Sequence, residues 1–383
     1  MPSHAGRSGR YIKQLEGHSA FIPNPLPPQP PLVYDDRMIA LLSSADRAVG
    51  RLEGSTTTLP NADLFVFMYV RREAALSSQI EGTQASLLDL LEFESRAADP
   101  DNPADVEEVA NYVAAMNLGL DRLAELPVSL RLIREIHERL LAGVRGANRT
   151  PGAFRRTQNW IGSPGCSLEE ATFVPPPVHE MKDALAKWER FVHSDVAMPP
   201  LIKVGLAHAQ FETIHPFLDG NGRVGRLLIT FLLVERGILS RPLLYLSLFF
   251  KKHREEYYAR LQATRDQGAW EAWLSFFLTG VAEVARDATE NAARIVAMRE
   301  EHRELVRERL GRGAGKALLL LEQLYFRPLV RVATVMQLTG LSSARANTLV
   351  LQLEDLGLLR ETSGRKRNRI FVYEPYMALF RSD

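Results

Sequence analysis

Residues 215–226 read His-Pro-Phe-Leu-Asp-Gly-Asn-Gly-Arg-Val-Gly-Arg, and they lie between two segments of helical character. Around Gly220 and Gly222, backbone N–H groups can be exposed where no Cβ blocks the approach of a ligand. If the run 227–235 that follows is a helix, the positive end of its dipole points at the same spot. The stretch therefore predicts an anion-binding turn at the start of a helix.

The side chains of this stretch suit a nucleotide and its phosphates. Arg223 and Arg226 are three positions apart, close to one helical turn, so both guanidinium groups can face one polyanion. Asp219 can hold a hard cation through its oxygens. His215 is the one group of the stretch that normally titrates near neutral pH, so it suits the removal of a proton from a hydroxyl. Together these parts predict a site that transfers a group from a nucleotide.

Two other interpretations of the stretch are weaker. Residues 220–225 match the dinucleotide pattern G-x-G-x-x-G, which must follow a strand and precede an acidic residue about 20 positions further on. The preceding run 201–213 is helix-like, and position 245 is Tyr. A glycine-rich turn with incidental surface charges is the other interpretation, and it does not explain why His, Asp, Asn and two Arg occur together.

The stretch resembles, at every fixed position, the H-x-F-x-[DE]-G-N-G-R-x-x-R pattern of the Fic (filamentation induced by cAMP) family. The resemblance implies a mainly α fold with a Fic-type helical core and a short β-hairpin flap. It also implies transfer of AMP from ATP to a hydroxyl of a target protein, or of the chain itself, with release of pyrophosphate. The family further favours a homodimer.

The resemblance assigns roles to individual residues. His215 would be the base, Asp219 would bind Mg²⁺, and Tyr257 would line the adenine pocket. The residues expected to bind the ATP phosphates are Gly220, Asn221, Gly222, Arg223, Gly225 and Arg226. An Asn that is frequent in the family further along is replaced here by Arg265.

A second pattern lies at the end of the predicted helix 61–75, which runs into Ser77, Glu81 and Gly82. Ser77 and Glu81 would share a helix face, and Gly82 is a natural stop. Taken alone, Glu81 reads as a solvated glutamate, although an acid near a helix C-terminus opposes the dipole. In the Fic family, S/T-x-x-x-E-G is inhibitory. The resemblance therefore implies a Glu81–Arg226 pair that keeps the γ-phosphate of ATP from seating.

Apolar periodicity predicts most of the remaining core as helix. The expected helices cover residues 37–52, 104–120, 129–143, 177–194, 200–214, 254–264, 270–281 and 282–309. Between them, runs 158–162 and 171–176 predict a β-hairpin. The resemblance makes this hairpin the flap that holds a target by strand addition, through Thr172, Phe173 and Val174. The alternative is a hairpin that only caps the core.

Both ends of the chain differ from this core. Residues 1–10 are expected to be disordered, and the proline-rich run 21–31 to be an extended strap. Glycines at 311–315 mark a boundary. Beyond it, three short helices (316–324, 330–338 and 342–356) and two strands (358–362 and 369–373) resemble a winged helix. Arg345, Asn347, Arg365, Lys366 and Arg367 could then contact DNA, although protein contact is an equal alternative.

Composition supports a globular protein of several domains. The chain has 383 residues, a net charge of +1 and a single cysteine, Cys166. These values predict a cytoplasmic protein with no intramolecular disulfide and no membrane partner. We expect an N-terminal Fic-associated module with the inhibitory helix (1–100), a catalytic core (101–310) and a winged-helix domain (311–383). Alternative functions are a DNA-binding regulator with a nucleotide-sensing core, and an enzyme that removes AMP.

Overall fold

Two buried helices joined by the 215–220 turn lie at the centre of the fold, α7 (Pro200–Ile214) and α8 (Asn221–Glu235). Every residue of α7 from Leu201 onwards is buried, as expected of a helix that is covered on all sides. The expectation placed the second helix at 227, but it begins at Asn221. The start of α8 carries the buried polar side chains of Asn221, Arg223 and Arg226, each of which has a hydrogen-bond partner. The apolar periodicity from which the helix was predicted therefore starts only after these residues.

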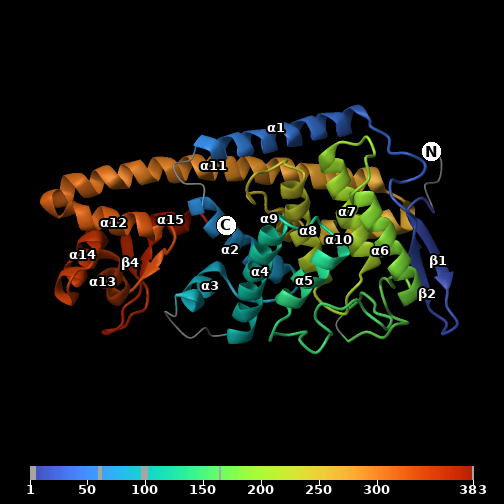
Figure 1. The fold of residues 1–383 in the computed structure, drawn as a ribbon, viewed down its shortest axis with the longest axis horizontal. Helices are drawn as coiled ribbons and strands as arrows, with labels where there is room; N and C mark the ends of the chain where they lie inside the picture. The colour runs from blue at the N-terminus through green and yellow to red at the C-terminus, as the bar shows by residue number, and fades with distance from the viewer. Residues whose placement is uncertain (1–5, 59–62, 96–101, 164, 382–383) are drawn as a thin grey trace.

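The computed structural model describes residues 6–58, 63–95, 102–163 and 165–381, and the predicted mainly α fold is confirmed (Figure 1). Helices surround α7 and α8 on several sides. They include α2 (Asp63–Ile80), α4 (Pro103–Arg122), α5 (Leu130–Leu140), α6 (Val178–Val192) and α10 (Arg254–Gln267). α3 (Leu87–Glu94) packs on α2 and α4, and α9 (Ser247–Lys252) packs on α2 and α10. In the described part of the chain, no helix has the length and apolar character needed to cross a bilayer.

The longest helix links the two ends of the molecule. α11 (Trp270–Leu310) is continuous, so the division into 270–281 and 282–309 was wrong. The change from an apolar to a charged sequence marks only the point where one helix leaves the core. α1 (Asp36–Thr58) packs along α11 (Figure 1).

The N-terminus is ordered from residue 6, so the expected disorder was wrong for residues 6–10; residues 1–5 lie outside the described part. β1 (Gly9–Lys13) and β2 (Ser19–Pro23) form an antiparallel hairpin. Arg7 bonds the carboxylate of Glu271, which fastens this end to the start of α11. The strap that follows also lies on the core, since Gln210 donates to the Asn24 carbonyl at 2.8 Å.

The predicted flap contains one antiparallel bridge, between Ile161 and Phe173, in place of two strands. The Phe21 N–H of β2 donates to the Val174 carbonyl at 2.9 Å. One side of the flap is therefore already bonded to the N-terminal hairpin. Turn residues and a polar loop at 163–171 shorten the pairing that alternation alone suggested.

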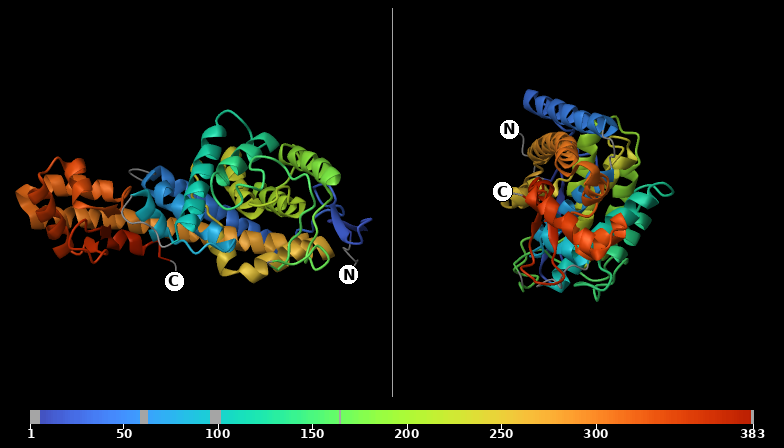
Figure 2. Two further views of the ribbon diagram at one scale, coloured as in Figure 1. Left: turned by 90° about the horizontal axis from the view of Figure 1, so that it is seen from below. Right: turned by 90° about the vertical axis from the view of Figure 1, so that its left-hand side faces the viewer.

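Beyond α11, a smaller module of helices and strands extends from the end of the core (Figure 2). Its elements are η1 (Gly311–Gly313), α12 (Ala314–Leu324), β3 (Leu329–Val330), α13 (Val332–Thr339), α14 (Ser343–Asp355), β4 (Leu359–Glu361), β5 (Phe371–Tyr373) and α15 (Glu374–Ala378). The sheet is antiparallel with the order β3-β5-β4. β3 and α15 were not anticipated, because each is shorter than a turn-bounded pattern can reveal.

Candidate functional site

A cavity of about 590 Å³ opens where α7 ends and α8 begins. His215, Arg226 and Glu81 line it from the core. Flap residues and one face of α10 complete the wall, including Trp160, Ile161, Thr172, Phe173, Tyr257, Tyr258 and Arg265. The predicted base, two predicted phosphate-binding residues (Gly222 and Arg226) and the predicted inhibitory residue thus share one cavity.

His215 ends α7 in a left-handed conformation, with φ of 49°. Its Nδ1 lies 3.3 Å from the Glu212 carbonyl, an arrangement in which Nδ1–H donates and leaves the Nε2 lone pair free. Burial, together with Arg265 and Arg155, lowers the pKa of His215 to about 3. The imidazole is therefore neutral at neutral pH and can accept a proton. Arg155 also donates to the His215 carbonyl at 3.1 Å, which fixes the backbone of the histidine.

The turn between the helices is built by its own side chains. Gly220 precedes α8 with φ of 77°, a conformation that favours glycine. The Asn221 side chain bonds both the N–H and the carbonyl of Phe217 at 2.8 Å. Asn221 thus closes the turn by its side chain, and what it can offer a ligand is its backbone N–H.

The other two glycines of the stretch are required by close packing. A Cβ on Gly222 would lie 2.2 Å from Oε1 of Glu81, and one on Gly225 would lie 2.2 Å from Oε1 of Glu212. Gly222 is needed for the approach of Glu81. Gly225 lets α7 and α8 pack closely, so the structure gives it no direct place on the cavity wall.

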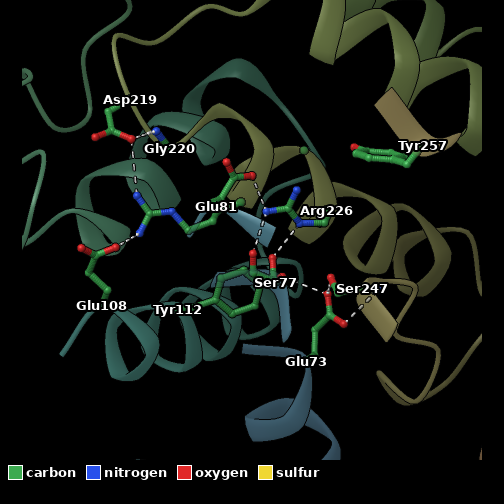
Figure 3. Close-up of polar contacts among 12 residues, drawn as sticks. Glu73, Ser77, Glu81, Glu108, Tyr112, Asp219, Gly220, Arg226, Ser247 and Tyr257 are labelled. Carbon is green, nitrogen blue, oxygen red and sulfur yellow. Dashed lines mark hydrogen bonds and ion pairs between the residues drawn. The ribbon is translucent and has the colours of Figure 1, made fainter. Parts of the chain in front are cut away.

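The predicted Glu81–Arg226 pair is present (Figure 3). Arg226 Nη2 donates to Glu81 Oε1 at 2.7 Å, while its Nε donates to the Ser77 hydroxyl at 2.7 Å. Burial would raise the pKa of Glu81, but the neighbouring Arg226 holds it below its ordinary value. Gly82 ends α2 with φ of 101°. The end of α2 therefore places a carboxylate on a guanidinium of α8.

Arg223 and Asp219 lie beside the cavity, outside the residues that line it. Arg223 is 1% exposed and donates to Oε2 of Glu108 at 3.0 Å. Asp219 is about one-third exposed, and its Oδ1 accepts the Gly220 N–H at 2.5 Å. Among the described residues, no group of three His, Cys, Asp or Glu side chains could hold a metal ion.

Tyr257 reaches the cavity with its ring while its hydroxyl is used elsewhere. The hydroxyl bonds Nε2 of His208 at 2.9 Å, and Nδ1 of His208 bonds the Gly225 carbonyl at 2.9 Å. Burial lowers the pKa of His208 to about 3, so this histidine is a neutral link between α7, α8 and α10. The neighbouring Tyr258 is 41% exposed and faces the same cavity.

Of the predicted flap residues, Thr172 is exposed whereas Phe173 and Val174 are buried. The Phe173 ring packs under the Arg265 guanidinium, whose carbon lies 3.9 Å from the ring centroid. The Val174 carbonyl is already bonded to β2. Of these flap residues, Thr172 is the one whose side chain can meet a target directly.

Sequence reasoning missed three side chains that shape the site: Glu108, Arg155 and Glu212. It named Arg265 only as the replacement of an Asn and did not predict its contact with Phe173. Glu212 is 6% exposed, and burial raises its pKa to about 7. Its position three residues before His215 was a usable signal. Glu108 and Arg155 gave none, because they meet the 215–226 stretch only through the fold.

The fold and the site define a class of protein. Its members have a helical core in which a glycine-containing turn begins a buried helix, and a carboxylate from an earlier helix pairs with an arginine of that buried helix. Residues 127–233 match the Fic/DOC family, and residues 39–121 match the Fic/DOC family N-terminal domain. Through these two segments the chain carries a Fic domain preceded by the N-terminal domain of the same family.

Curated relatives resemble the chain in sequence, and a solved structure resembles it in fold. The chain is 31% identical over 141 residues to a protein adenylyltransferase Fic of Culex quinquefasciatus, covering 36% of this chain and 25% of the relative. It is 28% identical to a probable protein adenylyltransferase of Aquifex aeolicus, covering 53% and 57% of the two chains. It thus spans a quarter to just over half of these relatives. A Fic family protein from Desulfovibrio desulfuricans G20 shares the fold, with a TM-score of 0.58 at 19% identity over 90% of this chain and 98% of that one.

Proposed function

We propose that this protein transfers AMP from ATP to a Ser, Thr or Tyr hydroxyl of a protein, which can be the chain itself. The observation that carries the proposal is the cavity in which a neutral His215 and the buried guanidinium of Arg226 lie at the start of α8. The names of the curated relatives support the same reaction.

The chemistry needs few groups. The target oxygen attacks the α-phosphorus, the bond from that phosphorus to the bridging oxygen breaks, and pyrophosphate leaves. The hydroxyl proton passes to Nε2 of His215, which is free because Nδ1 faces the Glu212 carbonyl. The N–H groups of the 220–222 turn, with Arg226 and Arg223, would hold the phosphates. Tyr257 would line the part of the cavity that holds the adenine base.

Mg²⁺ fits this scheme through Asp219. Magnesium is commonly held by one or two carboxylates, with substrate phosphates and waters as its remaining ligands. Asp219 supplies one partly exposed carboxylate next to the anion-binding turn. A bound magnesium would neutralise phosphate charge.

Autoinhibition by Glu81 is part of the proposal. Glu81 occupies Nη2 of Arg226, and Ser77 occupies its Nε and the same Nη2. A γ-phosphate would need these donors, so the carboxylate competes with it directly. Reaction then requires that Glu81 leave Arg226.

Incubation with ATP labelled at the α-phosphate tests the activity. The Glu81→Gly protein should incorporate label into protein, whereas Glu81→Gly combined with His215→Ala should not. The second variant should still bind ATP, because the imidazole faces the hydroxyl and not the phosphates. Equal labelling by the two variants would remove His215 from the mechanism.

Removal of AMP is the second candidate reaction, with Glu81 positioning a water. It is favoured by the partial exposure of the Glu81 side chain, 31%, toward the cavity. A target already carrying AMP should then lose it to the wild-type protein and keep it with Glu81→Gly. If neither protein releases AMP, this reaction is excluded.

We further propose three units, residues 1–100, 101–310 and 311–383, the last a winged helix that binds DNA. Arg345 on α14 and the loop residues Arg365, Lys366 and Arg367 are exposed, which supports this partner. Asn347 instead accepts a bond from Arg369 at 3.0 Å. Full-length protein should bind duplex DNA with an affinity that falls steeply with salt, and neutralising the three loop residues should weaken it. The absence of binding at low salt would favour a protein partner.

A cytoplasmic location and a homodimer complete the proposal. The single cysteine is consistent with a reducing compartment. Light scattering of the purified chain would test the dimer, and a monomer at micromolar concentration would exclude it.

A further inference from the structure

Arg223, the first arginine of the 215–226 stretch, is held at one end of its guanidinium by a residue outside that stretch. Its Nη1 donates to Oε2 of Glu108 at 3.0 Å, and both side chains are about 1% exposed. Glu108 comes from α4, 115 positions earlier in the chain (Figure 3). A pair this deeply buried fixes the arginine in one orientation, since breaking it leaves an uncompensated charge.

In the described part of the chain, the opposite edge of the same guanidinium has no hydrogen bond and only a long ion pair, in which Nη2 lies 3.5 Å from Oδ1 of Asp219. Nε and Nη2 of Arg223 are buried, and within the described residues neither has a hydrogen-bond partner. These two atoms form the side edge of the fork, which presents parallel N–H groups to two oxygens of one anion. Nη2 lies 3.5 Å from Oδ1 of Asp219, so this edge faces the start of α8. Buried donors without acceptors are costly, and a phosphate would satisfy both.

We propose that Glu108 is a positioning residue, which turns the Nε–Nη2 edge of Arg223 toward the phosphates and keeps Arg223 from closing its 3.5 Å ion pair with Asp219 into a hydrogen bond. Arg223 and Asp219 are four positions apart at the start of α8, where a closer ion pair could form. Such a pair would remove a phosphate ligand and a magnesium ligand together. Glu108 prevents it by holding Nη1. This inference rests on the proposed AMP transfer.

Arg145 strengthens the hold from the surface side. Its Nε lies 3.1 Å from Oε1 of Glu108, so each oxygen of the carboxylate faces an arginine. Burial raises the pKa of Glu108, and the two arginines oppose that effect. The Arg145 side chain is 55% exposed. The buried partner Arg223 is therefore the one whose position Glu108 determines within the site.

The test is a double-mutant cycle in the Glu81→Gly protein, with kcat and KM for ATP measured by labelled AMP incorporation. Glu108→Ala should lower kcat/KM roughly tenfold or more, since small displacements of a binding group have effects of that size. Glu108→Asp keeps the charge but moves the carboxylate oxygens away from Arg223, so kcat/KM should fall nearly as much as in Glu108→Ala. Glu108→Gln keeps an acceptor in place and should stay within about threefold of the parent. In the Arg223→Ala background, none of these changes should lower kcat/KM further.

Glu235→Ala is the matched control. It removes a carboxylate that accepts the Val128 N–H at 2.7 Å, at the far end of the same helix α8. Its effect should be the same with and without Arg223. The inference is overturned if the Glu108 variants lose as much in the Arg223→Ala background, or if they raise kcat/KM, which would make Glu108 a restraint.

ATP affinity, measured by calorimetry on the same variants, separates this inference from the proposed function. Coupling between Glu108 and Arg223 in ATP affinity, without AMP transfer by any variant, would refute the transferase and keep the positioning role. If the Glu108 and Arg223 substitutions have additive effects on ATP affinity while AMP transfer is active, the positioning role is refuted and the transferase is kept. If Glu108→Ala does not fold, Glu108→Asp decides the outcome by the same comparison.

Discussion

At the scale of single residues, the site is built from ionisable groups that burial keeps neutral or pairs with an opposite charge. Burial lowers the pKa of His137 to about 4, and those of His208 and His215 to about 3. Burial raises the pKa of Glu212 to about 7. The three histidines are therefore neutral at neutral pH and Glu212 is only partly ionised, while Glu81 and Glu108 stay beside arginines. The guanidinium groups are then the charges left to meet a polyanion.

The buried histidines predict loss of stability in mild acid. Below pH 6.5 the unfolded chain binds protons at these histidines that the folded chain does not, so stability falls as the pH falls toward 4. Each histidine contributes about 1.4 kcal/mol per pH unit in that window. Glu212 acts in the opposite direction between about pH 7 and 4.5, and burial also raises the pKa of Glu73 and Glu108. His302, whose pKa burial lowers, adds to the effect of the three histidines. Urea unfolding at pH 7.5 and pH 5 should show a clear decrease, and a flat or rising stability would contradict it.

Residue partners were predictable only where a pattern already linked them. The Glu81–Arg226 contact follows from two motifs that resemble one family, and it is present at 2.7 Å. The Glu108–Arg223 contact joins positions 115 apart, and Glu108 lies in an ordinary amphipathic helix. Local sequence does not show which helix will lie opposite Arg223. That information arises from packing, which single-sequence patterns do not contain.

At the scale of elements, α2 and α8 determine the site because each ends or begins beside it. Gly82 stops α2 one residue after Glu81, and Gly220 begins α8. Both glycines have positive φ, and both were expected as turn positions from sequence. The sequence did not predict the continuity of α11 or the single bridge of the flap, because neither depends on local preference alone. In each case tertiary packing overrides periodicity.

Alanine at Gly82 should separate the conformational role of this glycine from contact effects. A Cβ there would touch nothing within 4 Å, but φ is 101°, so strain alone should cost about 1–3 kcal/mol. Gly50 is the control, since it lies within α1 and its Cβ would also meet nothing within 4 Å. Gly50→Ala should stabilise the protein by roughly 0.5–1 kcal/mol. Chemical denaturation compares the two, and equal effects would refute the conformational explanation.

At the scale of the whole molecule, the C-terminal module packs back on the helix that carries Glu81. The ring centroids of Tyr69 on α2 and Phe380 lie 5.5 Å apart, and those of Phe67 and Phe326 lie 6.5 Å apart. α11 joins the same module to the core through one continuous helix. Core and module therefore share an apolar boundary as well as a covalent link.

Loss of Phe380 should weaken that boundary. Phe380 is 3% exposed, and truncation of a buried phenylalanine costs about 3–5 kcal/mol in a core. Phe380→Ala should lower the Tm and split the calorimetric transition into two, as the module begins to unfold separately. Leu351→Ala is the control, because Leu351 is a 38% exposed residue of the same module. A single transition at an unchanged Tm would show that the boundary is not a stabilising contact.

The proposed regulation depends on the restraint of Arg226 by Glu81, and labelled AMP incorporation at saturating ATP and Mg²⁺ tests this restraint most directly. Glu81→Gly should raise incorporation well above wild type, because Arg226 becomes free for the γ-phosphate. Ser77→Ala should raise it less. Glu81→Gly combined with Arg226→Ala should remove the gain, since the freed partner is then missing. A Glu81→Gly protein no more active than wild type would contradict the inhibitory role of the 2.7 Å ion pair.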